Sequence, residues 1–370
     1  MPKYKFSDIA INSTEKKKPV EEDKYTYIGL EHLDSGTLTV SRWGAEVAPK
    51  GEKLIMKKGD VLFGKRRAYQ KKVGVAPFDG IFSAHGMVLR PKEKVVTKEY
   101  FPLFISSNYF LDKAIQISVG SLSPTINWKD LQNLEFEIPS IEEQQHVAPV
   151  IWAAIDTKNA YNKLLQETDE LIKSQFIEMF GDPTINPKNM KMTTIGEVCD
   201  FQGGSQPPRK EFIFEPREGY VRLIQIRDYK TDEYITYAPK EKCRRFCDTD
   251  DIMIGRYGPP IFQILQGIEG AYNVALMKAI PHGIDKEFLR AYLKRDELLH
   301  HLERFQQRTA GQTGIDMGEL RSYPCPLPSI DEQKAYVEFV RQSDKSKFEL
   351  KQAIAGVDNL IRSLVQQELK

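Results

Sequence analysis

The sequence predicts an α+β protein made of two tandem copies of one plan, each a mixed domain followed by a long helix. With 370 residues, the chain exceeds what a single hydrophobic core usually organises. A six-residue motif recurs at a fixed distance, and an apolar stripe at heptad spacing follows each copy. These observations favour duplicated domains with helical rods over one large globule.

The repeat is centred on Pro139-Ser-Ile-Glu-Glu-Gln144, which recurs 189 residues later as Pro328-Ser-Ile-Asp-Glu-Gln333 with a single difference. Further upstream, Asp60-Val-Leu-Phe-Gly-Lys65 resembles Asp251-Ile-Met-Ile-Gly-Arg256. The two halves share a plan while the sequences of their middle parts diverge. This pattern is expected of two domains with the same fold that recognise different targets. An old duplication without division of labour is the alternative.

Each copy of the motif is predicted to start a helix. Ser140 with Glu143, and Ser329 with Glu332, have the spacing of capping boxes, in which serine and glutamate side chains satisfy each other's amides. A helix of about 40 residues would be about 60 Å long, too long to be packed inside one domain. The heptad positions are Leu165, Ile172 and Met179 in the first copy and Leu350, Val357 and Leu364 in the second.

The simplest arrangement pairs the two helices as an antiparallel coiled coil with pseudo-twofold symmetry; alternatively, each packs only on its own domain. Gly181 and Pro183 are expected to end the first helix, and Pro149 to kink its beginning. The predicted division is into mixed domains at 1–139 and 184–328 and helical spacers at 140–183 and 329–370.

Within the mixed domains, short apolar runs predict strands and longer periodic segments predict helices. We expect helices near Lys98–Ile115 and Lys286–Phe305. The expected strands are Asp60–Gly64, Ile81–Arg90, Val221–Ile226 and Asp251–Gly255.

The composition is that of a folded protein, with 41% hydrophobic, 10% aromatic and 28% charged residues. A net charge of +1 gives no hint of a polyanionic partner, so such a partner must be inferred from local charge. No apolar run reaches the roughly 18 residues of a membrane span, and the N-terminal segment lacks the apolar stretch of a signal peptide. We therefore expect a cytoplasmic protein without membrane contact.

The densest basic segment lies between Lys57 and Lys72, where seven cations accompany a single acid, Asp60. Such a cluster can neutralise phosphates, and arginine can read guanine edges in the major groove. A solvated surface turn is the alternative. The residues expected to contact DNA here are Lys65, Arg66, Arg67, Tyr69, Lys71 and Lys72.

Further DNA-binding candidates lie where the repeat places loops. Arg256 and Tyr257 follow the same strand and glycine as the basic segment of the first half. Polar glycine-containing loops let a backbone approach DNA, although such loops are also common as simple connections. They contribute Ser121 and Ser123 in the first half, and Gln202, Ser205, Gln206, Arg209, Gln312 and Thr313 in the second.

The first long helix is acidic, with eight acids against three lysines between Ser140 and Asp182. Such a rod would repel phosphate, so we expect it to contact proteins.

No catalytic or metal-binding residue is predicted. A Walker loop is absent from the sequence, and Tyr257-Gly-Pro-Pro-Ile-Phe262 lacks the leading side chain that amino-methyltransferases use. Cys243 and Cys247 could hold zinc only with distant ligands such as His282 or His300, so free thiols are favoured.

Over essentially its full length the chain resembles the specificity subunit of type I restriction-modification enzymes. The resemblance rests on Leu134-Glu-Phe-Glu-Ile-Pro139 running into Ser-Ile-Glu-Glu-Gln, on a long helix ending at Met179-Phe-Gly-Asp-Pro183, and on the second copy. The second helix ends at Lys370 with no counterpart of that terminal motif, which leaves open whether the termini close the subunit into a ring.

The resemblance implies two target-recognition domains, each reading one half of a bipartite site in double-stranded DNA, with the helices setting the gap. It implies methyltransferase subunits docked on the helices and restriction-translocase subunits joining them, in a prokaryotic cytoplasm near the nucleoid. Adenosylmethionine, ATP and magnesium would belong to those partners. The alternatives are a free-standing DNA nuclease or methyltransferase with an unrecognised site, and a scaffold that does not bind DNA.

Overall fold

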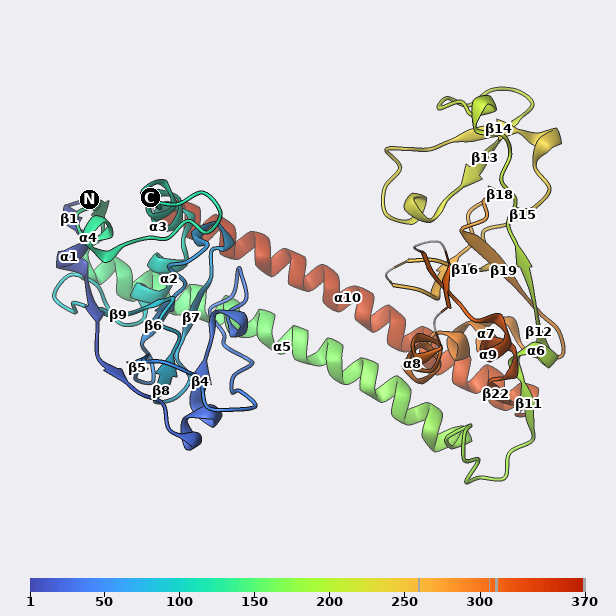
Figure 1. Cartoon of the computed structure of the whole chain (residues 1–370), viewed down its shortest axis with the longest axis horizontal. Coiled ribbons are helices and arrows are strands. Elements are labelled where there is room, and N and C mark those ends of the chain that lie inside the picture. Colours follow the sequence, from blue (N-terminus) through green and yellow to red (C-terminus); the bar gives the residue numbers. More distant parts are fainter. Residues whose placement is uncertain (259, 306, 310–311, 369–370) are drawn as a thin grey trace. The chain divides into compact units, whose positions relative to one another are not determined.

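The computed structural model describes residues 1–258, 260–305, 307–309 and 312–368, with side chains described except at 307–309, 312–313 and 366–368 (Figure 1). The chain forms two compact units. Unit 1 comprises Met1–Lys163 and Lys351–Lys370, and unit 2 comprises Leu164–Leu350. Each unit therefore combines a mixed domain with the beginning of one long helix and the end of the other.

Unit 1 contains a two-stranded ribbon and two four-stranded sheets. The ribbon pairs β1 (Lys3–Lys5) with β10 (Glu135–Glu137), and α1 (Phe6–Ile9) follows β1 in the chain. The first sheet has the order β2 (Ala10–Ser13), β9 (Met87–Pro91), β6 (Val61–Phe63), β7 (Val73–Val75). The second has the order β3 (Lys16–Lys17), β5 (Lys53–Met56), β8 (Gly80–Phe82), β4 (Tyr27–Ile28). Only the β4–β8 pair is parallel.

The helices of the first domain pack their apolar faces on the first sheet. The core of unit 1 is an aromatic cluster in which Phe110 lies 5.1 Å from Phe6 and 5.4 Å from Phe136, measured between ring centroids. All three rings are fully buried, and such clusters contribute strongly to core stability. The helices are α2 (Tyr100–Ser106), α3 (Asn108–Gln116) and α4 (Trp128–Leu131).

Unit 2 repeats the ribbon, the first sheet and three strands of the second sheet, but the fourth strand of that sheet pairs at the other edge. Its ribbon pairs β11 (Met192–Thr194) with β22 (Pro324–Pro326), followed from β11 by α6 (Ile195–Val198). Its sheets have the orders β12 (Cys199–Gly203), β19 (Leu276–Pro281), β16 (Ile252–Gly255), β17 (Gln263–Gln266), and β14 (Tyr237–Pro239), β13 (Tyr220–Ile224), β18 (Gly270–Tyr272), β15 (Phe246–Cys247). The fourth strand, β14, pairs with β13, the counterpart of β4, whereas in unit 1 β3 pairs with β5. The remaining elements are α7 (Lys286–Leu293), α8 (Asp296–Arg304), α9 (Met317–Ser322) and the hairpin β20 (Gln307–Thr309) with β21 (Gln312–Gly314).

The two long helices are α5 (Ile141–Phe180) and α10 (Ile330–Glu368). At the start of α5, the Ser140 amide donates to Glu143 Oε2 (2.7 Å) and the Glu143 amide donates to Ser140 Oγ (3.2 Å). Ser329 and Glu332 make the same two bonds before α10, at 2.8 and 3.4 Å. Gly181, with φ +75°, ends α5 in the left-handed conformation.

Within each unit the two helices pair in antiparallel directions. In unit 1, Lys158 of α5 forms an ion pair with Asp358 of α10 (2.7 Å). In unit 2, the repeat-equivalent pair joins Lys347 of α10 to Asp169 of α5 (3.1 Å), while Phe176 packs on Tyr336 with ring centroids 5.5 Å apart. The helices also contact the mixed domains, since Leu364 and Val365 pack on the core of unit 1, and Phe180 is part of the core of unit 2.

The structure confirms the α+β fold class and corrects some element boundaries. The expected strand Ile81–Arg90 is two strands in different sheets, because a turn closed by the Gly86 amide and the Ser83 carbonyl (3.0 Å) separates them. The expected helix Lys98–Ile115 is interrupted at Ser107, which is extended and caps α3 by accepting from the Phe110 amide (3.2 Å). α5 continues through Pro149 without interruption, and the kink expected at this residue stays a prediction.

The expected helix Lys286–Phe305 is likewise two helices, since Arg295 is extended between α7 and α8. In the described part of the chain, no helix combines the length and apolarity that crossing a membrane requires.

Candidate nucleic-acid interface

Residues 64–72 of the basic segment form the loop between β6 and β7, called the basic loop below, whereas Lys57 and Lys58 precede β6. Arg66, Arg67 and Tyr69 are exposed, with Tyr69 56% accessible, whereas Ala68 between them is buried. Arg67 (φ 54°) and Lys71 (φ 48°) both adopt the left-handed conformation, which is costly for residues with side chains. The loop therefore has a defined shape that presents two arginines and a tyrosine to solvent.

The lysines of this loop are occupied by intramolecular contacts. Lys71 Nζ lies 2.8 Å from both Asn108 Oδ1 and Asp112 Oδ1 of α3. Lys72 Nζ donates to the Leu30 carbonyl (2.6 Å). Lys65 is half-buried, and desolvation lowers the pKa of its ammonium group. The side chains of Lys71 and Lys72 hold the loop in place, while no ion pair among the described residues involves Arg66 or Arg67.

A second loop, residues 119–125, is joined to the basic loop. Its ends pair as Val119 and Thr125 exchange main-chain hydrogen bonds (2.9 and 3.0 Å). The Arg67 amide donates to the Pro124 carbonyl (2.8 Å), and a β-bridge links Arg66 to Thr125. The fold thus places the predicted Ser121 and Ser123 beside the arginines.

The same junction occurs in unit 2, where Tyr257 forms a β-bridge with Gly314. Allowing for the shift in the repeat, this bridge corresponds to the one between Arg66 and Thr125. The Arg256 guanidinium lies 5.3 Å from the centroid of the Tyr257 ring and donates to the Val274 carbonyl (3.4 Å). Gln312 and Thr313 lie on β21 of the β20–β21 hairpin, and their side chains are outside the described part of the structure.

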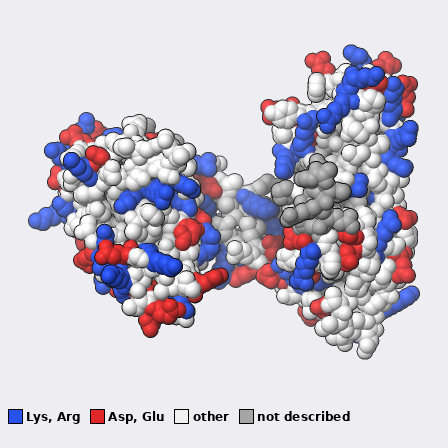
Figure 2. Space-filling model, in the orientation of Figure 1, with Lys and Arg blue, Asp and Glu red and all other residues white. Residues whose placement is uncertain are grey.

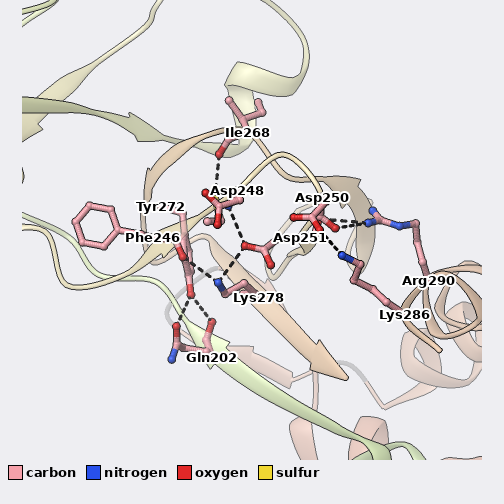
Figure 3. Close-up of polar contacts among 11 residues, drawn as sticks. Gln202, Phe246, Asp248, Asp250, Asp251, Ile268, Tyr272, Lys278, Lys286 and Arg290 are labelled. Atoms are coloured by element: carbon pink, nitrogen blue, oxygen red, sulfur yellow. Dashed lines mark hydrogen bonds and ion pairs between the residues drawn. The ribbon is translucent and has the colours of Figure 1, made fainter. Parts of the chain in front are cut away.

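The Gln202–Gln206 segment lies next to this junction and is only partly the predicted loop, because Gln202 and Gly203 pair with β19 as the last residues of strand β12. A Cβ on Gly203 would be 3.5 Å from Arg256 Nη1. Gln202 is partly engaged, since the Tyr272 hydroxyl contacts its side-chain and main-chain oxygens at 3.1 and 3.2 Å (Figure 3). Ser205 Oγ accepts from the Arg244 amide (3.4 Å), and Gln206 is exposed.

Arg209 is exposed but belongs to a different neighbourhood. It begins a short 3-10 helix, Arg209–Glu211, whose Glu211 pairs with Lys242 at 2.8 Å. No hydrogen bond within the described residues connects Arg209 to Arg256.

Sequence reasoning missed three exposed residues of unit 2: Arg244, Arg245 and Phe246. The signal was available, because Lys242-Cys-Arg-Arg-Phe-Cys247 is a compact basic and aromatic segment. Figure 2 shows Lys and Arg side chains gathered over the part of unit 2 that contains β13, β14, β15 and β18.

Sequence reasoning also missed the role of the repeated glutamines. Gln144 is fully buried and accepts from the Thr97 amide (2.7 Å) while donating to the carbonyls of Val95 and Pro139 (both 2.9 Å). Gln333 likewise accepts from the Asp285 amide (2.7 Å) and donates to Pro328 (2.9 Å). Each glutamine thereby joins the start of a long helix to the segment before α2 or α7.

The cysteines and possible metal ligands can be placed within the described residues. All four cysteines are free and buried, and burial raises the pKa of the Cys199 and Cys325 thiols to about 12. The described residues include no group of three or more His, Cys, Asp or Glu side chains positioned to hold a metal ion.

Comparisons with known proteins agree with this architecture. Residues 3–171 and 187–356 each match the family described as Type I restriction modification DNA specificity domain. Similar curated proteins include the EcoKI specificity subunit of Escherichia coli K12, 21% identical over 88% of this chain and 75% of that protein. The MjaVIII specificity subunit of Methanocaldococcus jannaschii is 21% identical over 92% of this chain and 85% of its own length.

Solved structures share the fold at low sequence identity. The type I restriction-modification S subunit from M. genitalium matches with a TM-score of 0.59 and 12% identity, over 100% of this chain and 96% of that one. A chain from a structural study of type I complex assembly and conformational transition matches with a TM-score of 0.57 and 18% identity, over 100% and 97%. The chain therefore belongs to the specificity-subunit family of type I restriction-modification enzymes, with both copies of the DNA specificity domain.

Proposed function

We propose that this non-catalytic chain selects the DNA on which a type I restriction-modification complex acts. The observation that carries the proposal is the pair of diverged copies of the DNA specificity domain. In this proposal each mixed domain reads one half of a bipartite double-stranded site. The spacers at 140–183 and 329–370 set the gap and dock methyltransferase subunits, to which restriction-translocase subunits are added.

The chemistry is assigned to those partners. Methyl transfer needs adenosylmethionine, and translocation with cleavage needs ATP and magnesium, so these cofactors are proposed to bind the partner subunits. The complex is proposed to act in the cytoplasm, at the nucleoid. A free-standing nuclease or methyltransferase finds no support in the comparisons.

In unit 1 we assign DNA contact to Arg66, Arg67 and Tyr69, together with Ser121 and Ser123. Exposed arginines without intramolecular carboxylate partners are free to bind phosphate or guanine. Lys65, Lys71 and Lys72 are assigned the role of shaping the loop. In unit 2 the proposed contacts are Gln202, Ser205, Gln206, Arg209, Arg256, Tyr257, Gln312 and Thr313.

The test replaces Arg66 and Arg67 with alanine in the reconstituted methyltransferase complex and sequences the methylated positions in a random DNA library. We expect relaxed or lost recognition of one half of the site, with the other half and partner assembly unchanged. The matched control, Lys92→Ala with Lys94→Ala, removes the same charge from exposed residues beyond the opposite end of β9. Equal loss at both halves, or an equal effect of the control, would contradict the assignment.

A second measurement addresses the non-catalytic role. The purified chain alone, given duplex DNA, adenosylmethionine, ATP and magnesium, should neither methylate nor cleave it. Turnover by the lone chain would contradict the proposal.

A further inference from the structure

A segment of unit 2, Arg244-Arg245-Phe246, is exposed between two buried cysteines. Cys243 is 7% and Cys247 2% accessible, and the Cys247 thiol donates to the Ile268 carbonyl (3.1 Å). Arg244 and Arg245 are exposed, and Phe246 is 40% accessible, so an aromatic ring lies in solvent beside two cations. The cysteines thus anchor both ends of a segment whose three side chains reach solvent.

The backbone of this segment is held at each residue. The Arg244 amide donates to Ser205 Oγ (3.4 Å), and the Arg245 carbonyl accepts from the Tyr272 amide (3.2 Å). The Phe246 carbonyl accepts from Lys278 Nζ (3.1 Å). In Figure 3 the Phe246 ring points away from the polar network around Lys278. A backbone fixed in this way avoids the cost of ordering the backbone on binding, so that only the side chains lose conformational freedom.

Neighbouring cations are neutralised, but these arginines are not. Lys242 pairs with Glu211 (2.8 Å), Lys278 with Asp251 (3.0 Å), and Lys286 with Asp250. Among the described residues, no ion pair involves Arg244 or Arg245. The guanidinium groups of two consecutive residues therefore lack a carboxylate partner among the described residues and are available for an external anion.

We propose that Arg244 and Arg245 bind the DNA phosphate backbone at unit 2, with the Phe246 ring packed on the adjacent deoxyribose. The inference rests on the proposed function and adds a contact element to it. DNA is favoured as the ligand because the Ser205 bond places the segment beside the Gln202–Gln206 loop. Gly203 in turn lies beside Arg256, since a Cβ on it would be 3.5 Å from Arg256 Nη1, so the Gln202–Gln206 segment links Arg244 to the predicted junction.

The test measures binding of the assembled methyltransferase complex to a cognate duplex and to a random duplex between 50 and 200 mM salt. Each phosphate contact contributes about 0.9 to the slope of log affinity against log salt concentration. Arg244→Ala with Arg245→Ala should therefore reduce the slope by about 1.8, so that the wild type loses roughly tenfold more affinity across this range than the variant. The reduction should be the same for both duplexes, because phosphates carry no sequence information.

Two further variants separate a phosphate contact from general charge. Arg244→Lys with Arg245→Lys should restore most of the slope. Lys242→Ala with Lys286→Ala removes the same charge from paired lysines and should change the slope much less. Phe246→Ala should weaken binding to both duplexes without changing the slope.

The outcomes distinguish this inference from the proposed function. If the wild-type complex shows no salt-dependent DNA binding, the proposed function itself fails. If the wild type binds and the arginine variant keeps its slope and affinity, only this inference is refuted. Loss of partner assembly at an unchanged slope would identify the segment as a protein contact and would likewise refute it.

Discussion

Replacing Gln144 with alanine tests whether the repeated glutamine joins the mixed domain to its helix. The substitution removes three hydrogen bonds, to Thr97, Val95 and Pro139, at a site with no solvent exposure. At about 1 kcal/mol net for each bond, the expected loss in unfolding free energy is about 3 kcal/mol, and more if the abandoned groups stay dry. Replacing Gln333, which makes two such bonds, with alanine should lower the unfolding free energy by about 2 kcal/mol.

Differential scanning calorimetry of the full chain measures the effect as a shift in Tm. For a unit of this size, 1 kcal/mol corresponds to roughly 2–4 °C, so Gln144→Ala should lower the Tm of unit 1 by about 6–12 °C. Hydrogen exchange adds a local readout, because the Thr97 amide should lose its protection. The control is Gln145→Ala, an exposed neighbour that should change stability by less than about 0.5 kcal/mol.

Two results would refute the reasoning. One is a Gln144→Ala variant as stable as the Gln145→Ala control. The other is unchanged exchange at Thr97, which would mean that this amide is protected without the glutamine.

Two further predictions concern the long helices. Reversing one charge with Lys158→Asp should destabilise the helix pair in unit 1 by about 0.5–1 kcal/mol, as measured by denaturant titration. Adding Asp358→Lys should recover most of that loss. A double variant less stable than the single variant would contradict the ion pair. Hydrogen bonds to Ser140 lower the pKa of Glu143, and those to Ser329 lower that of Glu332, so their stabilising contribution is present above pH 4.5 and is lost as the pH falls below it. The dependence of helix stability on pH should be reduced in Glu143→Gln, as measured by circular dichroism in acid titrations.

Local patterns made the helices predictable. The two capping boxes and the glycine that ends α5 act through hydrogen bonds and backbone angles within a few residues, so the spacing of residue types is sufficient. The pairing partner of each helix was also predictable in outline, because duplicated stripes at equal spacing favour each other. It was not predictable that the segment Ile81–Arg90 divides between two sheets, because both of its parts are apolar.

The basic loop shows how far the candidate site could be predicted from the sequence. Its six predicted residues look equivalent in sequence, yet Lys71 and Lys72 are held by groups 37 and 42 residues away. Only contacts over that separation decide which cations remain available. The Arg244-Arg245-Phe246 segment is visible in the sequence as a compact basic and aromatic stretch. Only the structure shows that Ser205, Tyr272 and Lys278 hold its backbone while its side chains are exposed.

The duplicated α+β plan and the capped helices of about 40 residues follow from the amino-acid sequence alone, because these features depend on short-range periodicity and on an internal repeat. Which side chains are paired and which are available for a ligand follows only from the folded structure. The folded structure also shows that the buried Gln144 and Gln333 connect helix to domain. These properties depend on the desolvation and pairing of groups far apart in the chain, and no local pattern encodes them.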